Sequence, residues 1–254
     1  MAPEESPCDL ATLLAAAREE GTLISTPPVE WIPTDSDAAF DVQHQILARR
    51  GQAIAGWKIG AKSPDGPIQG APLPEGAVRR QPGTARRSAH PILGLELELA
   101  FRFRRAFEPA DRPYSSEEVL QAISSVAAAI EVVSSRFAPW PKVDKLLQLA
   151  DLQNHGALIV GDDVPCDANY PFLAPSGQFK FDGERVYRLE LSNPAGDPRR
   201  LLVWLVNHSA SRGLTVTPDM WLTTGSYTGI HFPTGNGLAV GKFEGIPEVR
   251  VAIE

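Results

Sequence analysis

Residues 95–103 read LELELAFRF, a stretch in which apolar side chains alternate with mostly polar ones. Because successive side chains of a strand point to opposite faces, this period of two predicts a half-buried β-strand. Glu96 and Glu98 lie side by side on the polar face. That face either looks into water, with Arg102 and Arg104 continuing the polar row, or it brings two carboxylates together for chemistry.

The chain before this strand carries helical patterns. Leu10, Leu13 and Leu14 recur at helical spacing, and Gly21 follows them as a stop signal. We therefore expect a helix over 8–20, followed by a proline-rich linker over 27–33. A second helix is expected over 37–50, with a weak capping signal at Thr34 and Asp37. A long loop is expected over 63–91, and it contains Arg79, Arg80, Arg86 and Arg87.

The chain after this strand alternates helical and strand-like segments. Ser115 and Glu118 match a capping box, which predicts a helix that carries Val119, Ile123 and Val126. We expect strands over 130–133, 156–160, 185–191, 220–224 and 249–253, and a helix over 199–212. Helices first and strands later predict an α+β protein, with a small helical part and an active-site loop over 1–90 and a β-rich body over 91–254.

Composition limits the possible functions. The chain has 254 residues, 43% of them apolar, and a net charge of −7. This charge gives no general attraction to nucleic acid or to an anionic membrane. Cys8 and Cys166 make neither a disulfide framework nor a zinc motif. No signal-peptide pattern and no apolar run of about 18 residues occurs, so we expect a cytoplasmic protein without nucleic-acid or membrane partners.

Glu131 interrupts the apolar run 126–133. A carboxylate buried there needs a cation or strong hydrogen bonds. Arg136 is one candidate partner, and a solvent-facing position at the junction of helix and strand is another. If the strand of Glu131 lies beside that of Glu96 and Glu98, three carboxylates converge, and a divalent cation offsets their repulsion. Oxygen ligands favour magnesium, manganese or calcium over zinc.

Two further segments carry chemically useful side chains. In GWKIG, residues 56–60, Lys58 sits between apolar neighbours and glycines, either as an acid, base or anion-binding group or as an ordinary strand lysine. TTGSYTG, residues 223–229, is either a carboxylate-binding turn or a plain hydroxyl-rich one. The chain contains no nucleophile elbow, P-loop or GxGxxG motif.

These motifs together resemble the 2-keto-4-pentenoate hydratase family. The matching stretches are GWKIG at 56–60, LELELAF at 95–101, AIEVVSSR at 129–136, the segment 151–161 and TGSYTG at 224–229. That family includes the 4-oxalocrotonate decarboxylases and is part of the fumarylacetoacetate hydrolase superfamily. The resemblance implies a mixed β-roll like the C-terminal domain of fumarylacetoacetate hydrolase, a helical N-terminal part and a homo-oligomer.

The resemblance also implies a metal-dependent reaction. Glu96, Glu98 and Glu131 would hold Mg²⁺ or Mn²⁺, and Lys58 would be the active-site lysine. The leading expectation is a hydratase that adds water to a 2-hydroxy-2,4-dienoate from aromatic catabolism and forms a 4-hydroxy-2-oxo acid. The alternatives are a 2-oxo-3-hexenedioate (4-oxalocrotonate) decarboxylase, an acylpyruvate hydrolase and a non-catalytic partner subunit.

The remaining site residues follow from the same resemblance and from its departures. Glu75 stands where the family usually has an aspartate, and we expect it to assist Lys58 in proton transfer. Ser226 and Thr228 would lie at the substrate end. In the decarboxylase alternative, a cation near the second carboxylate is needed, with His155 and Arg136 as the candidates.

Overall fold

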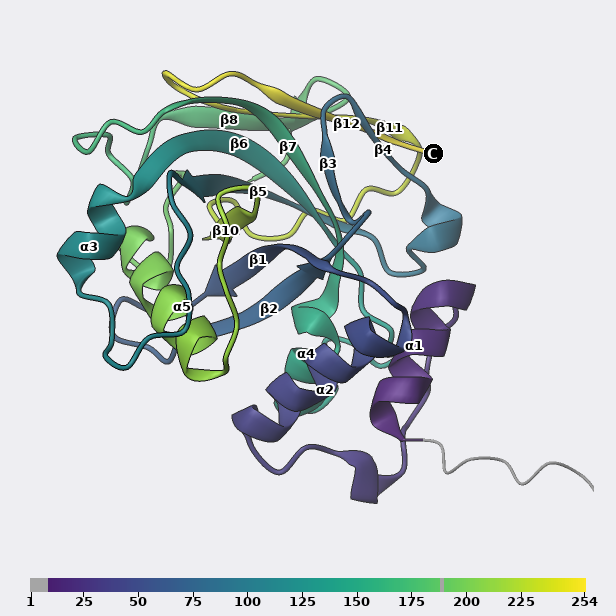
Figure 1. Cartoon of the computed structure of the whole chain (residues 1–254). Helices are drawn as coiled ribbons and strands as arrows, with labels where there is room; N and C mark the ends of the chain where they lie inside the picture. The colour runs from purple at the N-terminus through teal and green to yellow at the C-terminus, as the bar shows by residue number, and fades with distance from the viewer. Residues whose placement is uncertain (1–8, 188–189) are drawn as a thin grey trace, which may run out of the picture.

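The computed structural model describes residues 9–187 and 190–254 and contains two β-sheets. The larger sheet has seven strands in the order β2 (Gln69–Pro74), β1 (Ile54–Gly60), β10 (Trp221–Ser226), β5 (Gly94–Phe103), β6 (Ile123–Val133), β7 (His155–Pro165) and β3 (Val78–Arg80). The smaller sheet has five strands in the order β4 (Gly83–Ala85), β12 (Val249–Ile253), β11 (Gly237–Phe243), β8 (Gly177–Phe181) and β9 (Glu184–Arg185). Figure 1 shows the larger sheet curling into a half-barrel.

The strand β5 lies in the middle of the larger sheet, between β10 and β6. Its leucines and phenylalanines belong to the main hydrophobic core, which includes residues of β8, β11 and β12. The two sheets approach closely at Gly241, where an added Cβ would lie 2.4 Å from Leu97 Cδ1. A larger residue at this position would therefore force Leu97 to move. The opposite face of β5 is also buried, because Glu98 is only 1% exposed and Ala100 is 0% exposed. The polar face of LELELAFRF thus does not look into water at Glu98.

The α-helices contact the larger sheet at β1, β2 and β10. Figure 1 shows α1 (Leu10–Glu20), α2 (Ser36–Arg49) and α4 (Lys145–Ala150) gathered near one end of the larger sheet, and α3 (Ser116–Gln121) beside α5 (Arg199–Ser211). Asp9 caps α1 through Thr12 N, and the helix ends at Gly21 with a φ of 67°. The short 3-10 helices are η1 (Val29–Trp31), η2 (Arg87–Ala89) and η3 (Leu152–Asn154). The helix predicted over 8–20 is observed as Leu10–Glu20. Cys8, where the prediction began, lies outside the described residues.

The long loop expected over 63–91 is wrong, since β2, β3 and β4 form within it. The prolines suggested a loop, but β2 is the edge strand of its sheet, where a residue without an N–H is tolerated. Leu73 and Ala71 on β2 are fully buried. Residues before 90 therefore contribute strands to both sheets, and the expected division at residue 90 stays a prediction.

Two other expected elements also differ from the structure. The capping box at Ser115 and Glu118 is confirmed, but the helix ends at Gln121, and Ile123 and Val126 belong to β6. Pairing of β6 with β5 on one side and β7 on the other outweighs the helical pattern. The strand expected over 185–191 is confined to Glu184–Arg185, and residues 188–189 of that segment lie outside the described residues.

The remaining predicted elements agree with the structure within a few residues, namely α2, β7, α5, β10 and β12. The cap of α2 is Asp35, whose carboxylate accepts a hydrogen bond from Ala38 N, rather than Thr34. Among the described residues, no helix has both the length and the apolar character that crossing a membrane requires.

Candidate metal centre and active site

Three glutamates converge on one face of the larger sheet. Glu96 and Glu98 lie on β5, and Glu131 lies directly opposite Glu96 on β6. One carboxylate oxygen from each residue lies within 4.8 Å of the others. Glu131 is fully buried, Glu98 is nearly so and Glu96 is half-buried. Three carboxylate oxygens at this spacing suit a divalent cation with oxygen ligands.

The two oxygens of Glu131 have different surroundings. Its Oε1 accepts a hydrogen bond from Lys58 Nζ at 2.6 Å and is 2.9 Å from His155 Nδ1. Its Oε2 is buried and has no hydrogen-bond partner among the described residues. A buried carboxylate oxygen without a partner is costly, and Oε2 is therefore available as a metal ligand. This orphaned oxygen supports the fit of a cation to the three glutamates.

Glu98 is held in place by β10. Its Oε2 accepts hydrogen bonds from Thr223 Oγ1 and, at 3.0 Å, from Gly225 N. Gly225 has a φ of 90°, a conformation that favours glycine. The segment of Thr223 and Gly225 was expected to be either a carboxylate-binding turn or a plain hydroxyl-rich one, and in the structure it binds the carboxylate of the protein's own Glu98.

Burial and mutual repulsion change the protonation of this cluster. Burial, together with the neighbouring glutamates, raises the pKa of Glu96 and that of Glu98 to about 8. Burial lowers the pKa of Lys58, but the negative charges of Glu131, Glu98 and Glu96 outweigh this effect and raise it. Lys58 therefore carries its proton, and its single positive charge does not offset three carboxylates. A divalent cation bound here would supply the missing charge.

Lys58 reaches the site from β1, beside β10. Besides Glu131, its Nζ donates a hydrogen bond to Gln153 O at 3.1 Å. Three consecutive residues that are not glycine, Leu152, Gln153 and Asn154, have positive φ values of 48°, 51° and 59°. Such residues store backbone strain and cluster at functional sites. The strained turn places the Gln153 carbonyl against the lysine, and no glycine marks it in the sequence.

A buried ion network holds this turn behind the site. Asp151 accepts hydrogen bonds from Arg18 at 2.7 Å and from Arg136 at 3.1 Å, and both arginines also donate to His155 O. Arg136, predicted as a substrate-binding residue, is thus occupied by Asp151. His155, predicted in the same role, is fully buried. Burial, with the positive charges of Lys58 and Arg18, lowers the pKa of His155 well below its usual value. The neutral ring therefore orients Glu131 by donating from Nδ1.

A pocket of about 480 Å³ opens in front of the glutamates. Lys58, Glu96, Gln153 and Ser226 line it together with Asn154 and Gly225. A smaller pocket of about 90 Å³ adjoins it and is lined by all three glutamates. Ser226, predicted as a substrate-binding residue, lines both pockets, and its role stays a prediction. Lys62 and Lys145 also line the larger pocket, and no sequence motif marked either of them.

Like Arg136 and His155, two further predicted residues do not line these pockets. Thr228 accepts a hydrogen bond from Leu97 N and donates one to Gly229 O, so its hydroxyl is engaged within the protein. Glu75 is exposed and follows Pro74, the end of β2 that pairs with Ile54, while Lys58 pairs with Ala71 in the middle of β2. The two pairs are four residues apart along β1 and three along β2, which corresponds to about 10–13 Å of strand. The structure does not bring Glu75 to the glutamates.

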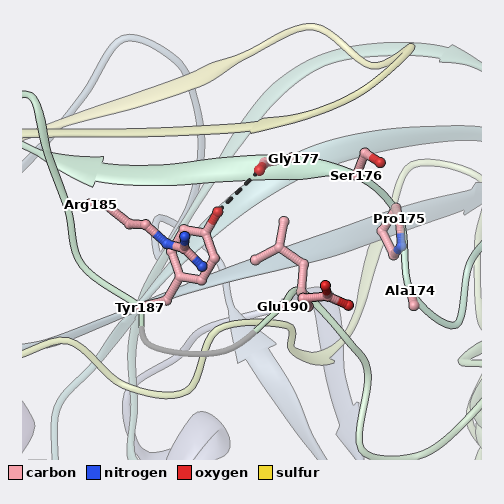
Figure 2. Close-up of a pocket in the computed structure, with 8 residues that line it drawn as sticks. Ala174, Pro175, Ser176, Gly177, Arg185, Tyr187 and Glu190 are labelled. Atoms are coloured by element: carbon pink, nitrogen blue, oxygen red, sulfur yellow. Dashed lines mark hydrogen bonds between the residues drawn. The ribbon is translucent and has the colours of Figure 1, made fainter.

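Another pocket, of about 320 Å³, lies away from the three glutamates, beside β8 and β9 (Figure 2). Figure 2 shows Tyr187 donating a hydrogen bond to Gly177 O, with Arg185 beside the tyrosine ring. Glu190 is the one carboxylate among its lining residues. The described residues that line this pocket therefore offer no set of metal ligands. We place the candidate site at Glu96, Glu98 and Glu131.

Comparison with known proteins assigns the fold. No family model matches the chain. The chain has the fold of the fumarylacetoacetate hydrolase superfamily. It is similar to 4-oxalocrotonate decarboxylase from Pseudomonas putida G7 in complex with magnesium and adipate, with a TM-score of 0.83, 19% identity and 96% of each chain covered.

Two more distant structures share the fold. One is fumarylpyruvate hydrolase from Pseudomonas aeruginosa in complex with Mn²⁺ and pyruvate, with a TM-score of 0.58, 14% identity and coverage of 78% of this chain and 88% of the other. The other is a putative fumarylacetoacetate hydrolase family protein from Yersinia pestis CO92, with a TM-score of 0.56, 14% identity and coverage of 80% and 94%. The mixed α+β fold predicted from the sequence is confirmed.

Proposed function

We propose that the protein is a metal-dependent decarboxylase that acts on 2-oxo-3-hexenedioate or a similar unsaturated 2-oxo dicarboxylate. The observation that carries the proposal is the convergence of three carboxylates, one with an orphaned buried oxygen, beside Lys58. The likeness to a 4-oxalocrotonate decarboxylase over 96% of both chains supports decarboxylation over the hydration that we expected first.

Glu96, Glu98 and Glu131 would hold Mg²⁺ or Mn²⁺. A metal ion bound here would act as a Lewis acid toward the 2-oxo acid end of the substrate and stabilise negative charge on its oxygen. Ser226 and the Gly225 backbone line the pocket beside Glu96 and help to orient that end. His155 keeps Glu131 in position from behind.

The reaction breaks the bond between C5 and C6. Carbon dioxide leaves from C6, and the electron pair is delocalised along the conjugated chain to the oxygen on C2. Lys58 Nζ, which carries a proton, stabilises this developing negative charge and returns a proton to the product. The strained turn at Gln153 fixes the direction of the lysine through its carbonyl.

An assay with purified protein and magnesium tests the proposal. We expect carbon dioxide release from 2-oxo-3-hexenedioate, its loss with a chelator and its recovery with Mg²⁺ or Mn²⁺. Lys58→Met should lower kcat by about 10²–10³-fold. Lys180→Met is the control, because Lys180 is exposed on β8. The proposal fails if metal-loaded protein releases no carbon dioxide from this substrate.

The hydratase remains the second candidate, because the motifs that it shares with the decarboxylase include GWKIG and LELELAF. Both reactions need the same stabilised anion, so the cluster alone does not separate them. The same assay with 2-hydroxypenta-2,4-dienoate decides between the two. Water addition to this compound without carbon dioxide release from the dicarboxylate would favour the hydratase.

A further inference from the structure

The second carboxylate of a dicarboxylate needs a positive charge that the glutamate cluster and Lys58 do not provide. Three glutamates balance a divalent ion and Lys58, so the inner end holds no surplus positive charge for a second carboxylate. Arg136 is occupied by Asp151, and His155 is buried behind Glu131. A second carboxylate must therefore find its cation elsewhere in the pocket.

Lys62 and Lys145 line the same pocket as Lys58 and Glu96. Both are exposed, and neither has an ion pair or hydrogen bond among the residues that the structure describes. Lys62 follows β1 by two residues and therefore lies on the chain segment that carries Lys58. The lining also includes apolar residues, namely Ala61, Pro67, Leu149 and Pro194.

The position of Lys145 is not explained by helix stability. It is the first residue of α4, directly after the N-cap Asp144. A positive side chain in the first turn interacts unfavourably with the helix dipole. Asp144 uses Oδ1 to accept a hydrogen bond from Leu146 N and makes no ion pair with the lysine. The lysine is thus free to interact with a ligand in the pocket.

We infer that Lys62 and Lys145 form a cationic subsite that binds the second carboxylate of the substrate and selects dicarboxylates over monocarboxylates. The inference rests on the proposed function for the orientation of the substrate, with its 2-oxo acid end at the glutamates. The carbon chain then lies against the apolar lining residues. In decarboxylation the second carboxylate loses its charge as carbon dioxide leaves, so the lysines stabilise the bound substrate more than the transition state.

Calorimetry with two probes tests the subsite independently of turnover. Adipate and hexanoate have the same chain length and differ by one carboxylate. In the presence of magnesium we expect tighter binding of adipate by the unmodified protein. Lys62→Gln and Lys145→Gln should each weaken adipate binding by about 2- to 5-fold, and the double variant by about 10-fold. Hexanoate binding should change by less than about 2-fold in every variant.

Lys142→Gln is the matched control, since Lys142 is exposed nearby but does not line the pocket. It should leave the affinity for adipate unchanged. The inference is overturned if the unmodified protein binds adipate no better than hexanoate, or if the double variant keeps the preference for adipate. These outcomes leave the decarboxylase proposal intact, because turnover is measured separately.

Kinetics add a second readout. If 2-oxo-3-hexenedioate is turned over, the double variant should show a raised KM while kcat does not fall, because the lysines act on the bound substrate. A fall in kcat with KM unchanged would contradict the subsite. If the double variant loses its adipate preference and neither protein releases carbon dioxide, the subsite holds and the proposed reaction is wrong.

Discussion

Glu96 on β5 and Glu131 on β6 are directly opposed across two antiparallel strands. Like charges at such a cross-strand pair destabilise a sheet, and here Glu98 adds a third carboxylate within 4.8 Å. Repulsion among the three carboxylates therefore lowers the stability of the metal-free folded protein. The cation that we propose to bind there would recover the lost stability on binding.

The first prediction concerns the stability of the metal-free protein as a function of pH. Burial and neighbouring charge raise the pKa of Glu96 and that of Glu98 from 4.5 to about 8 in the folded chain. A carboxyl group whose pKa is higher in the folded chain than in the unfolded chain stabilises the folded state at pH values below its unfolded pKa. This stabilisation is lost as the pH rises through the pKa of the folded state. The Tm of metal-free protein should therefore fall between about pH 5 and pH 8. Magnesium should suppress this fall, as thermal unfolding with and without a chelator will show.

Replacing a ligand should have opposite effects on stability and metal binding. Glu98→Gln removes one negative charge and keeps an oxygen that accepts from Thr223 and Gly225. We expect the metal-free variant to unfold several degrees higher than the unmodified protein at pH 8, and to lose the stabilisation by magnesium. A variant that is less stable without metal would contradict the electrostatic argument.

His155 provides a test of the support behind the ligands. Its neutral ring contacts Glu131 Oε1 from a fully buried position. Removing such a partner usually costs about 10- to 100-fold in metal affinity or activity. We expect His155→Gln to weaken Mn²⁺ binding within this range, measured by calorimetry. His208→Gln serves as the control, because His208 stacks on Trp204 in α5, and Mn²⁺ affinity should stay unchanged there.

The Asp151 network should dominate the stability of the turn that carries Gln153. Asp151→Asn leaves Arg18 and Arg136 without a counter-charge in a buried place. Breaking a buried ion pair in this way costs about 3–5 kcal/mol. Urea unfolding should show a loss of this size. Asp162→Asn, which removes an exposed partner of Arg80, should cost less than about 1 kcal/mol. Equal losses in the two variants would refute the proposed role of the network.

The sequence indicated the three glutamates more clearly than it indicated their surroundings. The period of two at Glu96 and Glu98 follows from strand geometry alone, and Glu131 was visible as a charge within an apolar run. Their register across β5 and β6 depends on long-range pairing, which one chain does not reveal without a turn signal. The resemblance to a known family supplied the missing link between the two strands.

Other parts of the site had no local signal. The left-handed turn at Gln153 contains no glycine and is held by Asp151, whose arginine partners come from distant parts of the chain. His155 was recognised as a useful side chain, but its direction toward Glu131 depends on the pairing of β7 with β6. Lys62 and Lys145 are ordinary surface lysines by composition, and only the pocket that both line relates them to the site.

Mn²⁺ binding tests the central claim most directly. Calorimetry, combined with a crystal structure of the Mn²⁺-soaked protein that uses the anomalous signal of manganese, should show one ion per chain ligated by Glu96, Glu98 and Glu131. Glu131→Gln should abolish this ion while the chain stays folded. An ion bound elsewhere, or no ion at millimolar Mn²⁺, would contradict the metal centre and with it the proposed reaction.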